Sequence, residues 1–123
     1  MAESPPPSSA PSGTTVSTHV LDSVTGRPAA GVVVALERLA GALWEAVGTG
    51  TTDADGRVAS LAPDGVGPGT HRVVFATGEW FAAAGRAAFY PEVTVTFTVS
   101  AGDAHLHVPL LLAPYGYSTY RGS

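Results

Sequence analysis

Several residues of this sequence could transfer protons or bind an anion, among them three histidines and one arginine. His105 and His107 are separated by one residue, His19 lies in an earlier stretch, VSTHVLD, and Arg57 follows the turn sequence DADG. A histidine titrates near neutral pH, so its imidazole can take and return a proton. An arginine supplies fixed donors for an anion or for an oxygen atom that gains charge. Together these residue types favour acid–base chemistry on a water molecule.

Covalent catalysis has little support in this sequence. The chain contains no cysteine, which excludes a thiol nucleophile, a disulfide framework and a thiolate zinc site. It also lacks the Gly-x-Ser-x-Gly motif of a nucleophilic serine, so direct attack by water is the simplest mechanism. His105 and His107 could instead bind a metal, because alternate side chains of a strand share one face, but two histidines without a third ligand are poor evidence for zinc.

Each candidate also has an ordinary structural interpretation. His19 by itself could be a surface histidine, and an arginine after Asp-Gly is often only a turn residue. We expect His105 to be structural or to support the reacting groups. His71, within the predicted strand 70–77, is expected to be exposed to solvent.

Composition predicts one domain built from short strands. The chain has 123 residues, 45% hydrophobic and 13% charged, with 15 glycines and 10 prolines, so turn formers are abundant and long helices are disfavoured. Its net charge is −4 and it has six basic residues without a basic run, which argues against nucleic-acid binding. Residues 1–13 are rich in proline and serine, and we expect them to form a disordered tail before a domain at 14–123. The sequence shows neither a secretory signal nor an apolar stretch that could cross a membrane, so a cytoplasmic location is expected.

The elements that must position these residues are mostly strands. Alternating or continuous apolar patterns bounded by turns predict about eight strands, at 16–22, 31–39, 41–53, a short one from Arg57, 70–77, 91–99, 105–114 and 115–121. One short helix is predicted within 78–88, with Gly85 at its end. The sum is an all-β, antiparallel β-sandwich.

The strand that begins at His105 is apolar on both faces. One face carries Leu106, Val108, Leu110 and Leu112, and the other carries His105, His107, Pro109, Leu111 and Ala113. A two-layer sandwich buries only one face of each sheet by itself. We therefore expect a second subunit to cover the other face, with the histidines in a groove between subunits.

Three segments, STHVLDSVTGRPA, DADGR and HLHVPLLLAPYGYSTYRGS, resemble the 5-hydroxyisourate hydrolases, which are transthyretin-like proteins of purine catabolism. The resemblance covers residues 16–123. It implies a sandwich of two four-stranded sheets with one short helix, assembled as a homotetramer that is a dimer of dimers. It also implies hydrolysis of 5-hydroxyisourate, a purine-derived small molecule, to 2-oxo-4-hydroxy-4-carboxy-5-ureidoimidazoline in urate degradation, with no cofactor and no metal.

The resemblance also assigns residues to roles. The catalytic positions fall on His19, Arg57 and His107, and the substrate-binding positions fall on the closing tetrapeptide, which is Tyr120, Arg121, Gly122 and Ser123. Either His107 or His19 would activate water while Arg57 orients the substrate. The hydroxyl and terminal carboxylate of Ser123 could also take part.

Two other classes of function are compatible with a sandwich fold. The chain could be a non-catalytic, transthyretin-like carrier of a small molecule, but the carrier lacks the hydrolase residues found here, and Tyr120 would obstruct an open channel. It could also be a structural sandwich module, against which the single-domain length and the histidines argue.

Overall fold

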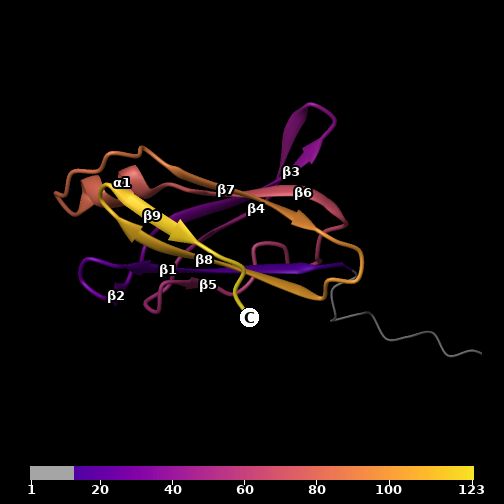
Figure 1. Ribbon diagram of the computed structural model, residues 1–123, viewed down its shortest axis with the longest axis horizontal. Helices are drawn as coiled ribbons and strands as arrows, with labels where there is room; N and C mark the ends of the chain where they lie inside the picture. Colours follow the sequence, from indigo (N-terminus) through magenta and orange to yellow (C-terminus); the bar gives the residue numbers. More distant parts are fainter. Residues whose placement is uncertain (1–12) are drawn as a thin grey trace, which may run out of the picture.

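The computed structural model describes residues 13–123, which form two β-sheets packed face to face and one short helix (Figure 1). The predicted tail at 1–13 lies outside the described residues except for Gly13. Because a Cβ at Gly13 would lie 2.5 Å from the Val66 carbonyl oxygen, Gly13 is packed against the domain. The elements are β1 (Thr15–Asp22), β2 (Arg27–Pro28), β3 (Val33–Ala40), β4 (Leu43–Thr51), β5 (Arg57–Val58), β6 (Gly69–Phe75), α1 (Thr77–Ala83), β7 (Val93–Val99), β8 (His105–Ala113) and β9 (Gly116–Thr119).

The sandwich prediction is confirmed, with two corrections. One sheet has the order β4-β3-β6-β7, and the other has the order β2-β1-β8-β9 with β5 also paired to β1. The second sheet thus has five strands instead of four, because the two short strands β2 and β5 share one edge of β1. The antiparallel prediction is wrong for β1 and β8, which run parallel, whereas the other strand pairs between residues 13 and 123 are antiparallel. A long connection permits parallel pairing, and alternation along a strand does not report its direction.

The core lies between the two sheets and follows the predicted alternation. On β8, the inward residues Leu106, Val108, Leu110 and Leu112 are all buried. The opposite sheet contributes Val34 and Leu36 from β3, and Val73 and Phe75 from β6, each with no exposed surface. Burial of these apolar side chains, about 25 cal/mol per Å² removed from water, stabilises the sandwich.

The helix prediction is confirmed. Helix α1 ends at Ala83, and Gly85 follows with φ +68°, a left-handed conformation that favours glycine. Phe81 anchors the helix in the core, and the Arg86 guanidinium binds the buried Asp22 carboxylate at 2.6 Å. No helix within residues 13–123 is both long and apolar enough to span a bilayer.

The expectation that His71 is exposed is wrong. Its side chain has no exposed surface, because β6 alternates and His71 shares the inward face of Val73 and Phe75. Its Nδ1 lies 3.1 Å from the Gly69 carbonyl oxygen, and its ring centroid is 6.1 Å from that of Phe97. Within residues 13–123, its Nε2 is buried without a hydrogen-bond partner.

We predict that His71→Asn destabilises the protein. The substitution removes a ring from the packed interior and leaves a polar amide there, so the free energy of unfolding should fall by about 1–3 kcal/mol. The midpoint of urea unfolding measures this change. The matched control is Thr96→Ala on the exposed face of β7, which should have a much smaller effect. Equal midpoints for His71→Asn and the wild type would contradict the buried position.

Candidate functional site

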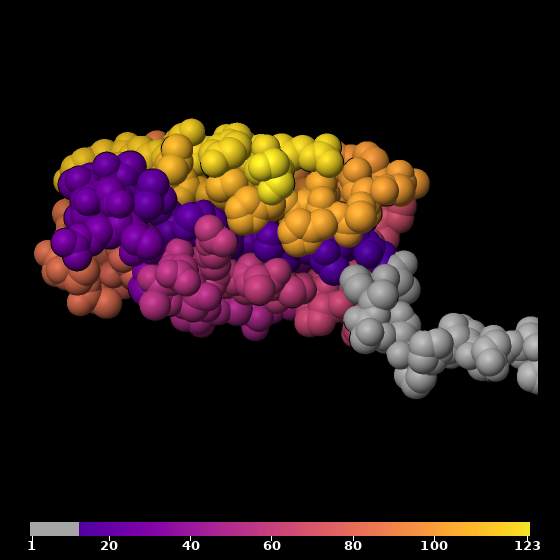
Figure 2. Space-filling view, turned by 90° about the horizontal axis from the view of Figure 1, so that it is seen from below, coloured from indigo at the N-terminus to yellow at the C-terminus, as the bar shows by residue number. Residues whose placement is uncertain are grey.

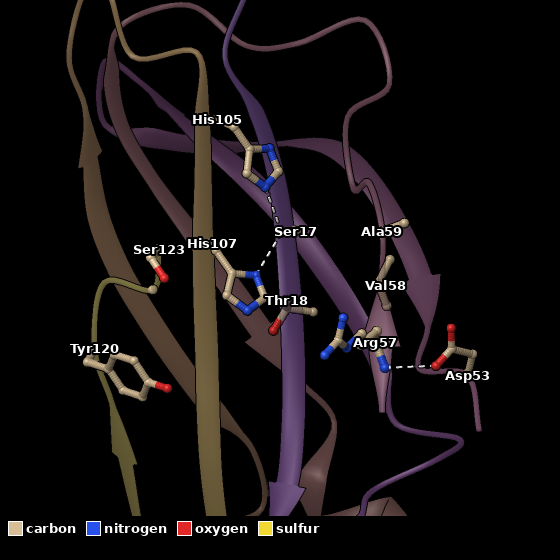
Figure 3. Close-up of a pocket in the computed structure, with 11 residues that line it drawn as sticks. Ser17, Thr18, Asp53, Arg57, Val58, Ala59, His105, His107, Tyr120 and Ser123 are labelled. Atoms are coloured by element: carbon tan, nitrogen blue, oxygen red, sulfur yellow. Dashed lines mark hydrogen bonds between the residues drawn. The ribbon is translucent and has the colours of Figure 1, made fainter. Parts of the chain in front are cut away.

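A pocket of about 530 Å³ opens on the face of the five-stranded sheet that points away from the core (Figure 3). It is lined by Ser17, Thr18, Asp53, Arg57, Val58, Ala59, His105, His107, Tyr120, Gly122 and Ser123. These residues come from β1, from β5 and the segments on either side of it, from β8, and from the segment after β9. Figure 2 shows these segments, far apart in the sequence, meeting on one face of the molecule.

Strand pairing places the predicted catalytic residues next to one another. His19 of β1 is directly opposite Arg57 of β5, and Ser17 of β1 is directly opposite His107 of β8. Side chains of directly paired residues lie about 5 Å apart at Cβ on the same face. His19, half-buried, is therefore beside the pocket, although it is not among the residues that line it.

The Asp-Ala-Asp-Gly turn holds Arg57 at the edge of the pocket. The Asp53 carboxylate accepts hydrogen bonds from the backbone N–H groups of Asp55 (2.9 Å) and Arg57 (3.0 Å). The bond from Arg57 is the main cause that lowers the pKa of Asp53. Gly56 completes the turn with φ +75°, where a side chain would be strained. The turn thus directs the Arg57 guanidinium into the pocket, toward Thr18 and His107 (Figure 3).

Hydrogen bonds join the two histidines of β8 through β1. The Ser17 hydroxyl lies 2.8 Å from His105 Nε2 and 2.7 Å from His107 Nδ1. The other nitrogen of His105, Nδ1, lies 2.6 Å from the Thr15 hydroxyl. These bonds occupy both ring nitrogens of His105. Within residues 13–123, no group of three His, Cys, Asp or Glu side chains could hold a metal ion.

The C-terminal segment returns to β8 and closes the pocket. The backbone N–H of Gly122 donates to the His107 carbonyl at 2.9 Å. A Cβ at Gly122 would lie 2.5 Å from His107 Cδ2 and 3.1 Å from Pro109 Cγ, so no larger residue fits without displacing the imidazole. This contact brings Tyr120 and Ser123 to the pocket.

Arg121, in contrast, lies outside this pocket. Its guanidinium is 3.6 Å from the Asp103 carboxylate and is largely exposed. It lines a neighbouring apolar cavity of about 150 Å³ with Val95 and Phe97 of β7.

The pocket favours the neutral form of the His107 imidazole by lowering its pKa. Burial is the largest cause that lowers its pKa, and nearby His19, His105 and Arg57 lower it further, because a positive charge on the ring would be repelled by theirs. The ring thus stays an uncharged proton acceptor below the usual histidine pKa of about 6.5.

Some pocket residues were not singled out from the sequence. Ser17 shares a face with His19 by simple alternation, and Asp53 begins the turn that precedes Arg57, so both signals were present. The partners of Ser17 were not visible, because β8 lies about 90 residues further along the chain.

Comparisons with known proteins agree with this geometry. The model of the HIUase/Transthyretin family matches residues 16–122. The chain is 49% identical over 109 residues to the 5-hydroxyisourate hydrolase of Salmonella dublin, covering 88% of this chain and 80% of that protein. It is 46% identical over 114 residues to 5-hydroxyisourate hydrolase 2 of Rhizobium meliloti, covering 88% and 95%.

Solved structures share the fold. The 5-hydroxyisourate hydrolase of Klebsiella pneumoniae superposes with a TM-score of 0.78 at 40% identity, covering 89% of this chain and 94% of that one. A transthyretin from Sparus aurata superposes with a TM-score of 0.80 at 29% identity, covering 87% and 95%. The architecture is therefore common to proteins named as hydrolases and as transthyretins.

We predict that His107 titrates below pH 6.5 in the folded protein, as followed by the NMR shift of its ring Cε1 proton. Arg57→Gln should raise the midpoint, because it removes a cation that disfavours the imidazolium, but burial should keep the value below 6.5. The control Arg38→Gln, in an exposed ion pair with Glu45, should leave the midpoint unchanged. A wild-type midpoint at or above 6.5 would show that the pocket does not favour the neutral ring.

Proposed function

The chain belongs to the HIUase/Transthyretin family, and we propose that it hydrolyses 5-hydroxyisourate to 2-oxo-4-hydroxy-4-carboxy-5-ureidoimidazoline in urate degradation. One observation carries this proposal: the His107 imidazole, whose pKa is lowered, and the Arg57 guanidinium line the same polar pocket. The relatives at 46–49% identity over most of this chain are named as enzymes of this activity.

The geometry supports attack by water without a covalent intermediate. In our proposal, His107 takes a proton from water as the water oxygen attacks a carbonyl carbon of the substrate ring. Arg57 donates hydrogen bonds to the carbonyl oxygen, which gains negative charge. The carbon–nitrogen bond then breaks, and the proton passes to the leaving nitrogen. We propose that His19, which pairs directly with Arg57, assists this transfer.

Tyr120, Gly122 and Ser123 are proposed to bind the substrate, because each lines the pocket. Gly122 acts by its small size, since it leaves room for the His107 ring. The position of Arg121 beside Asp103 favours a bracing role for this residue over direct contact with substrate.

The carrier alternative fits the site less well. A carrier of a hydrophobic molecule needs an apolar channel, whereas this pocket presents two histidines, an arginine and an aspartate. The identity to a solved transthyretin is 29%, against 40% to a solved hydrolase.

We also propose that the protein is a homotetramer, a dimer of dimers that places the pocket in a groove between subunits. Beside the pocket, the outer face of β8 carries Leu111 and Ala113, which are half-buried, whereas Pro109 between them and His107 is buried. Tyr115 and Tyr117 nearby are 71% and 43% exposed. An apolar surface of this kind favours contact with a second copy. The expected cytoplasmic location stays a prediction.

We predict that the protein accelerates the loss of 5-hydroxyisourate, followed by ultraviolet absorbance against the spontaneous rate. His107→Asn or His19→Asn should lower kcat by about 10²–10⁴, the usual share of general-base catalysis. Wild-type activity should fall only below pH 6.5, because protonation of His107 removes the base and its pKa is lowered. Arg57→Lys should also be damaging, because a point charge cannot replace the planar fork of donors.

The matched control for that assay is Arg38→Lys, which changes an exposed arginine of the β3–β4 hairpin. It should keep normal activity. His71→Asn is unsuitable as a control, because His71 is buried. Near-normal turnover of both histidine variants would reject the mechanism, and a wild type that binds planar aromatic ligands without catalysis would favour the carrier.

We predict a mass of about four times the 12.4 kDa chain in light scattering at micromolar concentration. The physical reason is burial of the apolar outer face of β8 against other copies. Leu111→Glu should lower the mass, because it places a charge in that contact, whereas the control Thr96→Glu on the exposed side of β7 should not. A stable monomeric wild type would reject the shared groove.

A further inference from the structure

We propose that Ser17 and His105 are positioning residues that hold His107 in the tautomer with a proton on Nδ1 and a free lone pair on Nε2. This inference rests on the proposed function for its meaning in catalysis, but the tautomer can be measured without substrate. From the sequence we expected only that His105 is structural or supports the reacting groups, and Ser17 was not singled out.

The Ser17 hydroxyl has a single hydrogen that it can donate. Its oxygen lies within hydrogen-bond distance of a nitrogen of both His105 and His107, at 2.8 and 2.7 Å. One hydroxyl can donate to only one of two acceptors. The Ser17 hydrogen is used within this pair of bonds only if Ser17 donates to one ring and accepts from the other, and this arrangement links the protonation of the two rings.

The direction of this chain of hydrogen bonds follows from its other end, at Thr15. The Thr15 hydroxyl is within 3.4 Å of the Ala104 carbonyl oxygen, to which it can donate. It then accepts from His105 Nδ1–H at 2.6 Å, which leaves His105 Nε2 as the acceptor for the Ser17 hydroxyl. Ser17 in turn accepts from His107 Nδ1–H. In this direction every hydrogen of the chain has an acceptor.

The electrostatics of the pocket favour the same direction. The second nitrogen of His107, Nε2, is directed away from Ser17 into the pocket (Figure 3). The positive charge of Arg57 acts on the His107 ring from the side of Nε2. A lone pair on Nε2 stabilises this cation, whereas an N–H group there would repel it. The reverse direction would present His107 Nε2–H toward Arg57.

The consequence is a base whose reactive nitrogen is fixed before substrate arrives. The hydrogen bond at one ring nitrogen sets which nitrogen is protonated and how the ring is oriented. The carboxylate of a Ser-His-Asp triad performs this task with a negative charge that stabilises the imidazolium. The Ser17 hydroxyl is uncharged, so it fixes the orientation while leaving His107 ready to return its proton to the leaving nitrogen.

The test measures the tautomer by two-bond ¹H–¹⁵N NMR correlations of ¹⁵N-histidine-labelled protein above the titration range. The wild type should show His107 protonated at Nδ1. Ser17→Ala should change the tautomer or leave a mixture, and it should lower kcat by about ten- to a hundredfold, as for the loss of an orienting partner. Ser17→Thr, which keeps a hydroxyl, should retain the wild-type tautomer. The matched control Ser23→Ala removes a hydroxyl that bonds β8 at Leu112, remote from His107 in the strand, and should change neither property.

A double-mutant cycle separates positioning from general damage. If Ser17 and His105 act as one chain, Ser17→Ala with His105→Ala should cost little more in kcat than Ser17→Ala alone. The pH profile of kcat is measured for each variant and compared with that of the wild type. Other titratable or charged groups surround His107 and could also affect this profile, namely His19, Asp53, Arg57, His105 and Tyr120. Additive losses, a wild-type ring protonated at Nε2, or an unchanged tautomer in Ser17→Ala would each overturn the proposal. A wild type without hydrolase activity but with the Nδ1-protonated ring would reject the proposed function and leave the hydrogen-bond chain intact.

Discussion

The parallel pairing of β1 with β8 is the interaction on which the rest of the structure depends. It runs along eight residue pairs, from Thr15 opposite His105 to Asp22 opposite Leu112. The register decides which side chains face one another, because a shift of one residue would turn every side chain of a strand to the opposite face. In the observed register Ser17 meets His107, and the same pairing aligns the apolar inner faces of both strands with the core.

The same two strands therefore serve stability and chemistry on opposite faces. Val16, Val20, Leu110 and Leu112 have at most 1% of their surface exposed, and they hold the strands against the second sheet. The alternate residues point outward and carry hydroxyl and imidazole groups. Because the core fixes the backbone, the polar groups of the outer face keep their spacing without needing strong bonds to one another.

Short elements attached to this strand pair complete the pocket. The two-residue strand β5 pairs with β1 and places Arg57 opposite His19. The C-terminal segment adds Gly122, whose lack of a side chain lets the backbone approach the His107 ring. The comparisons with hydrolases and transthyretins show one architecture in proteins of different names, so the function must be argued from these outward-facing residues and not from the fold.

Alternation and turn chemistry in the sequence by themselves determined the strands other than the two-residue β2, the short helix, the inward leucines of β8 and the turn before Arg57, because these depend on neighbouring residues. The alternation of His71 with Val73 and Phe75 also indicated that His71 lies on the buried face, although its polar side chain favoured an exposed position. Tertiary structure alone decided the parallel direction of β1 and β8, the bonds of Ser17 to two histidines, and the turn of Arg121 away from the pocket. These depend on contacts between segments about 90 residues apart, or on the path of the chain after β9, and local patterns carry no information about either.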